Sequence, residues 1–366
     1  MSKNCVVGSR RTAIRGSVRR WAKARRCIRA RHPRLPRANA AAGGARAEIV
    51  LGFPAADYAD TLARELRAAT GRDERTLEIV VRSEIVAHAV QKGLKPLPGI
   101  SNVVAVASGK GGVGKSTVAA NLALAWTRQG ARVGLLDADI YGPSQPLMMG
   151  LTGRRPATRD GKRIEPLAAH GVAVMSIGFL IDPAQPMVWR GPMVTQALTQ
   201  LLGDTEWGAL DYLVIDMPPG TGDIQLTLAQ RVPVSGAVIV TTPQDIALAD
   251  ALKGLKMFEK VAVPVLGIVE NMSTHICENC GHEEHIFGAG GGARLAQENG
   301  LAVLGELPLD RRIREEADGG RPTVVAEPAS PRALAYFEMA RRTAVRLAGS
   351  ARDYSRLFPK ITIEDS

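Results

Sequence analysis

Short apolar runs alternate with longer segments of helical periodicity from residue 102 to about residue 347. Strands joined by helical crossovers predict an α/β fold with a mostly parallel, doubly wound sheet that helices cover on both faces. The expected helices are residues 115–128, 191–202, 224–230, 246–260, 290–299 and 331–347. The apolar runs have the length and β-branched content of buried strands; they are Val103–Ala107, Arg132–Leu136, Val172–Ser176, Tyr212–Ile215, Gly236–Thr241, Val265–Val269 and Ala302–Gly305.

A smaller strand–helix–strand pattern precedes this domain. Glu48–Gly52 and Leu77–Val81 are short and apolar, and Ala56–Ala69 between them has helical spacing. We therefore expect a truncated α+β segment at residues 47–95, the main domain at 96–350 and a C-terminal tail at 351–366. A segment as short as 47–95 has a marginal core of its own.

The positive charge of the chain is concentrated at its N-terminus. The formal net charge is +11, and residues 1–46 contribute +14 through twelve Arg and two Lys, which leaves −3 for the rest. This tail lacks apolar periodicity, so we expect it to be disordered. A transit peptide, a start codon assigned too far upstream and a basic arm are all consistent with it. Because the tail is nearly free of aromatic residues, we expect no structured recognition of nucleic acid.

A glycine-rich loop follows the first strand of the pattern and opens the next helix. Glycines let backbone N–H groups converge on phosphate oxygens at a helix N-terminus. In such a loop Lys115 reaches the β- and γ-phosphates, and the Ser116 hydroxyl ligates Mg²⁺. The loop predicts a P-loop NTPase that binds ATP through Gly109, Lys110, Gly111, Gly112, Val113, Gly114, Lys115, Ser116 and Thr117.

The second residue of this loop carries an additional charge. A cation at Lys110 is not needed to hold phosphate within one subunit. Lys110 resembles the signature lysine of the deviant Walker A ATPases, which reaches the nucleotide of a partner subunit. The resemblance implies that ATP hydrolysis requires a homodimer.

Carboxylates follow two other strands, at the edge where ligands bind in parallel sheets. Asp137 and Asp139 are two residues apart on an extended segment, so they are expected to share a face. Asp216 ends an apolar strand in the Walker B arrangement and is expected to hold Mg²⁺ through water. By resemblance to related ATPases, Asp139 is the better candidate to orient the attacking water, and Asn271 is placed to meet the adenine. The run at residues 218–222, PPGTG, predicts a switch loop that senses the γ-phosphate.

Two of the four cysteines form a CxxC pair, Cys277 and Cys280. Four cysteines in 366 residues are no disulfide framework, which favours a reducing cytoplasm. The residues alone leave three chemistries open. One is a redox disulfide, and another is a zinc site that His282 and His285 complete. The third is an iron–sulfur cluster held by the CxxC pairs of a symmetric dimer.

Six strings occur in a characteristic order between about residue 100 and residue 345: VASGKGGVGKSTVAANLA, LLDADIYGPS, VIDMPPGTGD, ENMS, CENCGHEEHIFGAGGG and LGELPLD. Together they resemble the Mrp/ApbC family of iron–sulfur cluster carrier ATPases. The resemblance implies a homodimer that binds a [4Fe–4S] cluster at Cys277 and Cys280 of both subunits. It also implies transfer of the cluster to apoproteins and slow ATP hydrolysis, with Lys110, Lys115, Asp139 and Asp216 as catalytic residues. Residues 47–92 resemble the second half of a small domain that precedes the ATPase in many members.

Two alternatives share the P-loop. One is a positioning or partitioning ATPase of the MinD/ParA type, and the other is a zinc-containing P-loop ATPase. A membrane-acting version should end in a basic amphipathic helix, whereas this chain ends in LFPKITIEDS. No apolar run approaches the ~20 residues that a membrane span requires. We therefore expect a cytoplasmic protein whose partners are a second copy and apo iron–sulfur proteins, without a membrane or nucleic acid.

Overall fold

The computed structural model describes residues 28–29, 45–71, 73–75, 77–159, 161–180 and 191–353. The chain divides into two compact units. The first lies within residues 1–52 and 58–84, and the second comprises residues 53–57 and those from Ile85 on. The disorder predicted for residues 1–46 falls outside the described residues, apart from residues 28–29 and 45–46, as does most of the predicted C-terminal tail.

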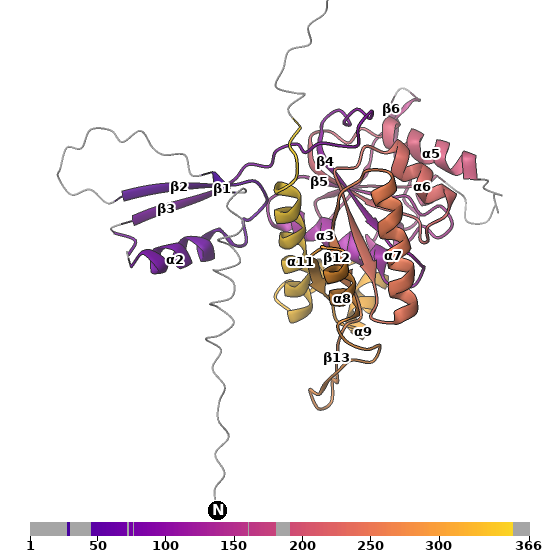
Figure 1. Ribbon diagram of the computed structural model, residues 1–366. Coiled ribbons are helices and arrows are strands. Elements are labelled where there is room, and N and C mark those ends of the chain that lie inside the picture. The colour runs from indigo at the N-terminus through magenta and orange to yellow at the C-terminus, as the bar shows by residue number, and fades with distance from the viewer. Residues whose placement is uncertain are drawn as a thin grey trace, which may run out of the picture. The chain divides into compact units, whose positions relative to one another are not determined.

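In its described residues the first unit contains a three-stranded sheet and the helix α2 (Figure 1). Strands β2 and β3 run parallel, and β1 pairs with β2 in the antiparallel direction. The helix contributes Ala63 to a small core with Leu77 and Ile79. The elements are β1 (Ile28–Arg29), β2 (Ala45–Leu51), α2 (Ala59–Thr70) and β3 (Leu77–Ser83).

Helix α2 begins three residues later than the apolar spacing predicts. The preceding segment, Phe53–Asp57, belongs to the second unit, where Phe53 and Ala55 are buried. The backbone N–H of Ala56 donates to the Gln129 carbonyl at 3.1 Å. Burial in the second unit therefore excludes these residues from the helix. The spacing of apolar residues cannot predict this effect, because it depends on tertiary structure.

The second unit is built on an eight-stranded sheet in the order β15-β12-β11-β4-β10-β5-β9-β8. All neighbouring strands are parallel except β8 and β9. The mostly parallel sheet is confirmed, and the short antiparallel edge strand β8 was not predicted. The strands are β4 (Ile100–Ala107), β5 (Val133–Asp137), β8 (Leu167–Ala169), β9 (Val172–Ser176), β10 (Leu210–Asp216), β11 (Gly236–Thr241), β12 (Val265–Glu270) and β15 (Val303–Glu306).

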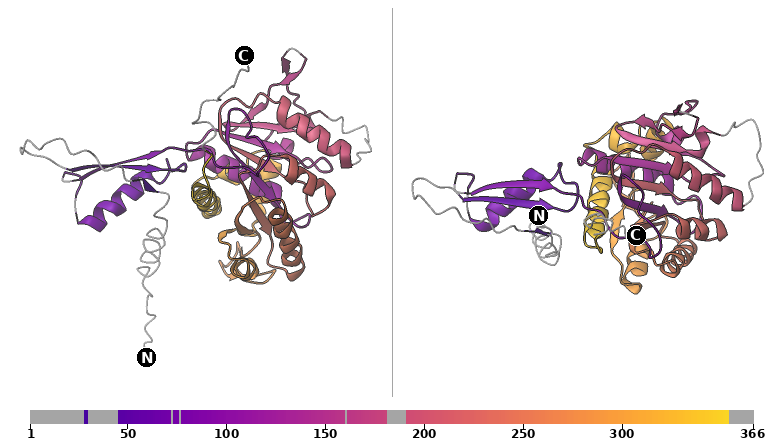
Figure 2. Two further views of the ribbon diagram at one scale, coloured as in Figure 1. Left: turned by 45° about the horizontal axis from the view of Figure 1, so that its top comes forward. Right: turned by 90° about the horizontal axis from the view of Figure 1, so that it is seen from above.

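Helices cover both faces of this sheet (Figure 2). One face is covered by α3 (Lys115–Arg128), α10 (Thr323–Ala326) and α11 (Pro331–Ala348), and the other by α7 (Asp245–Lys260) and α8 (Gly291–Glu298), with α6 (Asp223–Arg231) and α5 (Gly191–Asp204) beside them. None of the helices in the described ranges has both the length and the apolar character of a membrane span. Shorter elements are α4 (Gln145–Met148), η2 (Ile177–Phe179), α9 (Arg311–Asp318), and the hairpins β6 (Thr158–Arg159)–β7 (Arg163–Ile164) and β13 (His275–Ile276)–β14 (Glu283–Glu284).

A buried tryptophan fixes α3 against the sheet. The Trp126 ring stacks on Tyr212 of β10 with the ring centroids 4.3 Å apart, and both residues are almost fully buried. The indole N–H donates to the Ala340 carbonyl of α11 at 2.9 Å. Since α3 opens with the predicted P-loop lysine, this packing also fixes the loop.

The carboxyl ends of the central strands lie at one edge. In the parallel register, Asp216 of β10 is opposite Val106 of β4 and Asp137 of β5. The loops that follow these three strands therefore meet at the same edge, where ligands bind in open α/β sheets.

Candidate functional site

The loop between β4 and α3 has the backbone of a phosphate-binding loop. Gly112 and Gly114 both have φ of 81°, in the left-handed region that favours glycine. A Cβ on Gly109 would overlap the backbone carbonyl of Asp250 in α7, so only glycine fits there. The loop ends at the N-terminus of α3, where backbone N–H groups and the helix dipole favour an anion.

The P-loop lysine is engaged by the aspartate that ends β10. The Lys115 ammonium forms a buried ion pair with Asp216 and also donates to the Ser116 hydroxyl at 3.2 Å. Because a buried carboxylate is unfavourable without partners, this pair neutralises both groups. The structure thus brings together three predicted site residues: Lys115 and Ser116, which follow β4, and Asp216, which ends β10.

Gln145, which the sequence reasoning missed, ties these residues to the neighbouring strand. Its amide nitrogen donates to the Asp216 carboxylate at 2.9 Å and to the Ser116 carbonyl at 3.0 Å. Its backbone N–H donates to Asp137 at 3.0 Å. The available signal was a glutamine between Pro143 and Pro146, directly after the predicted carboxylates.

Asp137 and Asp139 have different surroundings, although they were expected to share a face. Asp137 is fully buried and accepts hydrogen bonds from the Asp139 N–H at 3.1 Å and the Ser176 hydroxyl at 3.1 Å. Desolvation, followed by the nearby Asp216, raises the pKa of Asp137 to about 7. Strand β5 ends at Asp137, so Asp137 accepts hydrogen bonds inside the protein, whereas Asp139 lies in the loop that follows.

Asp139 lines a cavity of about 410 Å³ together with Tyr141, Pro218 and Pro219 of the predicted switch loop. Burial raises the pKa of the Asp139 carboxyl, and Lys115 opposes the shift. Gln225 donates its amide to the Pro218 carbonyl and so holds the proline-rich loop over the cavity.

Two other predicted residues contact or form part of the P-loop. The Asn271 amide donates to the Val113 carbonyl at 2.9 Å, so in this structure it supports the loop from the end of β12. The Lys110 carbonyl accepts from the Ser108 hydroxyl at 2.9 Å. The Lys110 ammonium makes no hydrogen bond or ion pair with the residues that the structure describes.

The CxxC pair lies in the β13–β14 hairpin, which projects from the second unit (Figure 1). The Cys277 N–H donates to the His282 carbonyl at 2.9 Å, and Gly281 closes the turn with φ of 72°. Both thiols are free; Cys280 is exposed and Cys277 half-buried. The pair therefore occupies a tight turn at the surface.

The turn prepares Cys277 to be a thiolate. Hydrogen bonds from the backbone N–H groups of Cys280 and then Asn279 lower the pKa of the Cys277 thiol. Donors aimed at sulfur stabilise the charged form, which is the form that binds metal.

The structure does not assemble the single-chain zinc site. His285 donates Nδ1–H to the Ser273 carbonyl at 2.7 Å. Within the described residues, no three His, Cys, Asp or Glu side chains are grouped to hold a metal ion. A redox pair would be expected to open a helix, whereas Cys277 and Cys280 lie in a hairpin turn.

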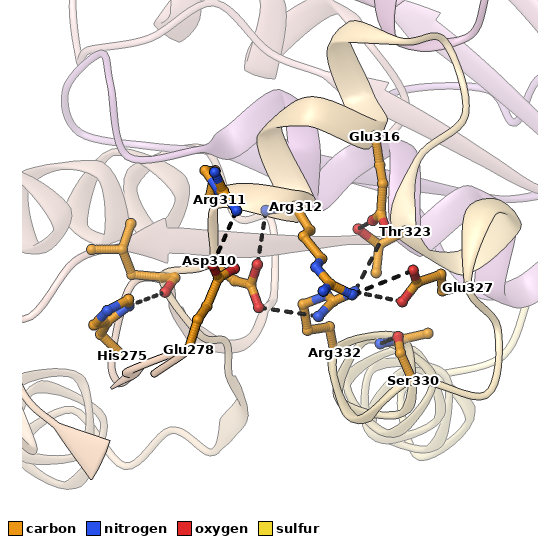
Figure 3. Close-up of polar contacts among 12 residues, drawn as sticks. His275, Glu278, Asp310, Arg311, Arg312, Glu316, Thr323, Glu327, Ser330 and Arg332 are labelled. Carbon is orange, nitrogen blue, oxygen red and sulfur yellow. Dashed lines mark hydrogen bonds and ion pairs between the residues drawn. The ribbon is translucent and has the colours of Figure 1, made fainter. Parts of the chain in front are cut away.

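Ion pairs anchor the hairpin to the start of α9 (Figure 3). Glu278 pairs with Arg311 at 3.0 Å. The preceding residue, Asp310, caps α9 and pairs with Arg332 of α11 at 3.2 Å. The Glu278–Arg311 pair is exposed, whereas the Arg332 side chain beside it is 13% exposed, so the hairpin contacts the exposed edge of a more buried charge network.

The geometry of the loop, the strand-end carboxylates and the hairpin has a counterpart in known proteins. A family model described as the ParA-type NUBPL iron-transfer P-loop NTPase matches residues 99–344. The chain belongs to this NUBPL family. The predicted resemblance to iron–sulfur cluster carriers is thereby confirmed, and the match lies wholly within the second unit.

Two relatives and one solved structure show how far the similarity to NUBPL-family proteins extends. An iron–sulfur cluster carrier protein of Pseudomonas fragi is 63% identical over 264 residues, covering 72% of this chain and 92% of that protein. The iron–sulfur cluster transfer protein NUBPL of Mus musculus is 53% identical over 271 residues, covering 74% and 84%. A nucleotide-binding protein of Archaeoglobus fulgidus, solved in complex with ADP, is 41% identical with a TM-score of 0.57, covering 65% and 93%.

The raised pKa of Asp137 predicts a pH-dependent loss of stability. The folded protein holds this proton more tightly than the unfolded chain, so its contribution falls as pH rises from about 4 to about 7. Over that range the unfolding free energy of the wild type should fall by roughly 3 kcal/mol more than that of Asp137→Asn. Urea titrations with EDTA and without nucleotide measure the difference; parallel pH curves would contradict the shift.

The lowered pKa of Cys277 predicts that its thiol is alkylated at a lower pH than an ordinary cysteine thiol. In a Cys5→Ser/Cys27→Ser/Cys280→Ser variant, only Cys277 reacts with iodoacetamide. Its rate should rise with a midpoint below the ~8.5 of an ordinary thiol, because the backbone donors remain. The same variant in urea is the control and should have an ordinary midpoint. Equal midpoints in folded and unfolded protein would refute the stabilised thiolate.

Proposed function

We propose that this protein is an ATP-dependent iron–sulfur cluster carrier, in which two copies hold one [4Fe–4S] cluster that is then transferred to apoproteins. The observation that carries the proposal is the hairpin with Cys277 and Cys280, which presents two thiols without a third ligand among the described residues. Such clusters are held by four thiolates. A second copy related by two-fold symmetry supplies the other two.

The surface around the cysteines supports a symmetric contact. Ile276 and Ile286 flank the turn and are 54% and 51% exposed. Large apolar side chains at the surface are stabilised when a partner covers them. Two hairpins that meet at these isoleucines would bring the four thiols together, and the cluster would remain near the surface for release.

The P-loop residues support binding and hydrolysis of ATP with Mg²⁺. The Ser116 hydroxyl and the Asp216 carboxylate offer the oxygen ligands that Mg²⁺ prefers, and they lie beside Lys115. In the structure Lys115 neutralises Asp216. When nucleotide binds, we expect Lys115 to turn to the phosphates, while bound Mg²⁺ would neutralise charge on Asp216.

Asp139 and Lys110 complete the proposed catalytic set. Asp139 lines the cavity beside the switch loop, where it would orient the attacking water. The Lys110 ammonium has no hydrogen-bond or ion-pair partner within the described part of its own chain, which supports its use at the nucleotide of a second subunit. A cytoplasmic location stays a prediction.

Anaerobic reconstitution with iron and sulfide tests the cluster. We expect about four irons per dimer and a visible charge-transfer absorbance. A Cys277→Ala/Cys280→Ala variant should lose both while it keeps nucleotide binding. Zinc in the protein as isolated, or iron that survives in the variant, would refute the assignment.

Mixed dimers test the shared active site. Lys110→Ala and Asp139→Ala should each reduce ATP hydrolysis by about 10²-fold or more. Mixed one to one, they should recover about a quarter of the wild-type rate, because half of the dimers are mixed and each has one complete site. A mixture of Lys115→Ala with Asp139→Ala is the matched control, since both residues serve the same subunit's site and neither site is complete. Equal rates in both mixtures would exclude hydrolysis across the dimer.

A further inference from the structure

Three consecutive residues join the P-loop to the cysteine hairpin. Asn271 follows β12, Ser273 precedes the hairpin, and Met272 lies between them. We infer that this segment, Asn271–Ser273, positions the cysteine hairpin according to the state of the P-loop. The inference rests on the proposed function only in taking Cys277 and Cys280 as the cluster site.

The first end of the segment is bound to the phosphate loop. Besides its hydrogen bond to the Val113 carbonyl, the Asn271 amide packs so closely on Gly114 that a Cβ there would overlap it. The Asn271 backbone N–H donates to Thr241 of β11 at 2.7 Å. Any rearrangement of residues 113–114 around a phosphate would therefore change the contacts of the buried Asn271 side chain.

The other end of the segment closes the base of the hairpin. The Ser273 carbonyl accepts from His285 Nδ1 at 2.7 Å. Because a carbonyl only accepts, Nδ1 carries the proton. His285 directly follows β14, the return strand, and Ser273 lies two residues before β13. The bond thus links the two strands that carry the CxxC turn.

Met272 between these ends is held in a strained conformation. Its φ of 58° lies in the left-handed region, which L-residues other than Gly, Asn and Asp seldom adopt. A strained residue persists because its neighbours determine it, so a change at Asn271 or Ser273 can release it. Met272 therefore makes the segment a stiff connection with two possible backbone states.

The entering side of the hairpin, which runs from Ser273 through Thr274 to His275, is fixed to the segment that follows β15; the Ser273 N–H itself donates to the Leu307 carbonyl at 2.9 Å. The Leu309 N–H donates to the Thr274 carbonyl at 2.7 Å, and His275 Nδ1 donates to the Leu309 carbonyl at 3.0 Å. The following Asp310 and Arg311 connect this side to the charge network around Arg332 (Figure 3). The return side is tied to this anchored side through the His285–Ser273 bond, so we expect a backbone change at Asn271–Ser273 to alter the geometry between the two strands rather than to move the hairpin as a whole.

Thiol reactivity tests the connection without any cluster. In a Cys5→Ser/Cys27→Ser background, alkylation of the hairpin thiols is timed without nucleotide and with Mg²⁺ and a non-hydrolysable ATP analogue. We expect the analogue to change the rate about fivefold or more, the scale of an ordinary coupling between two sites. Met272→Gly, which adopts either backbone state freely, should reduce this change to less than about twofold.

Two controls separate coupling from simple damage. Ala262→Gly also introduces glycine at a left-handed residue, exposed just after α7, and should behave like wild type. His285→Ala should lose the nucleotide effect, whereas His285→Asn, whose amide can replace the Nδ1 donor, should restore it. Nucleotide affinity, measured separately, should stay within about twofold of wild type in Met272→Gly and His285→Ala.

The outcomes also separate this inference from the carrier function. A wild-type nucleotide effect that persists in Met272→Gly and His285→Ala, or no effect in wild type, overturns the connection. Reconstitution of the cluster, measured on the same proteins, reports the carrier function independently. If the protein binds the cluster but nucleotide does not change thiol reactivity, the proposed carrier function stands and the proposed connection is wrong.

Discussion

The buried ion pair between Lys115 and Asp216 is the interaction on which the rest of the nucleotide site depends. Two opposite charges lie where the sheet excludes water, so each stabilises the other, and the Gln145 amide satisfies the second carboxylate oxygen. A second buried carboxyl, Asp137, lies close by with a raised pKa. Of the residues that the structure describes, Lys115 is the one lysine beside Asp216 and Asp137, so the charges at this edge of the sheet balance without nucleotide only while Asp137 keeps its proton.

This balance explains why the arrangement suits a ligand that brings both phosphate and a divalent cation. In the proposed function, phosphate would compete with Asp216 for the Lys115 ammonium, and a cation would restore charge compensation to the carboxylates. The exchange is local, because Trp126 and Tyr212 hold α3 and β10 in place beneath it. The consequences appear in the loops that contact the edge, namely the PPGTG loop and the segment that begins at Asn271.

Much of this architecture could be predicted from the sequence, because its signals are local. The apolar runs located all seven parallel strands from β4 to β15, and the glycine pattern located the P-loop. Two features could not be predicted, namely the residue at which helix α2 begins and the edge strand β8. The former depends on burial of Phe53 in another unit, and the latter is three residues long. Gln145 was missed for a similar reason, since its partners come from three separate segments. The different surroundings of Asp137 and Asp139 arise because β5 ends at Asp137, so the alternation of side chains along a strand does not extend to Asp139.

The two ends of the large sheet limit how copies of this protein can associate. The edge strands β8 and β15 have three and four residues, and short edges offer few unpaired backbone groups to another sheet. Side-by-side growth into a continuous sheet, the route by which many β-rich surfaces aggregate, is thereby disfavoured. The dimer proposed above would instead use the loops at the carboxyl edge and the projecting hairpin, where contact can be made and broken without disturbing the fold.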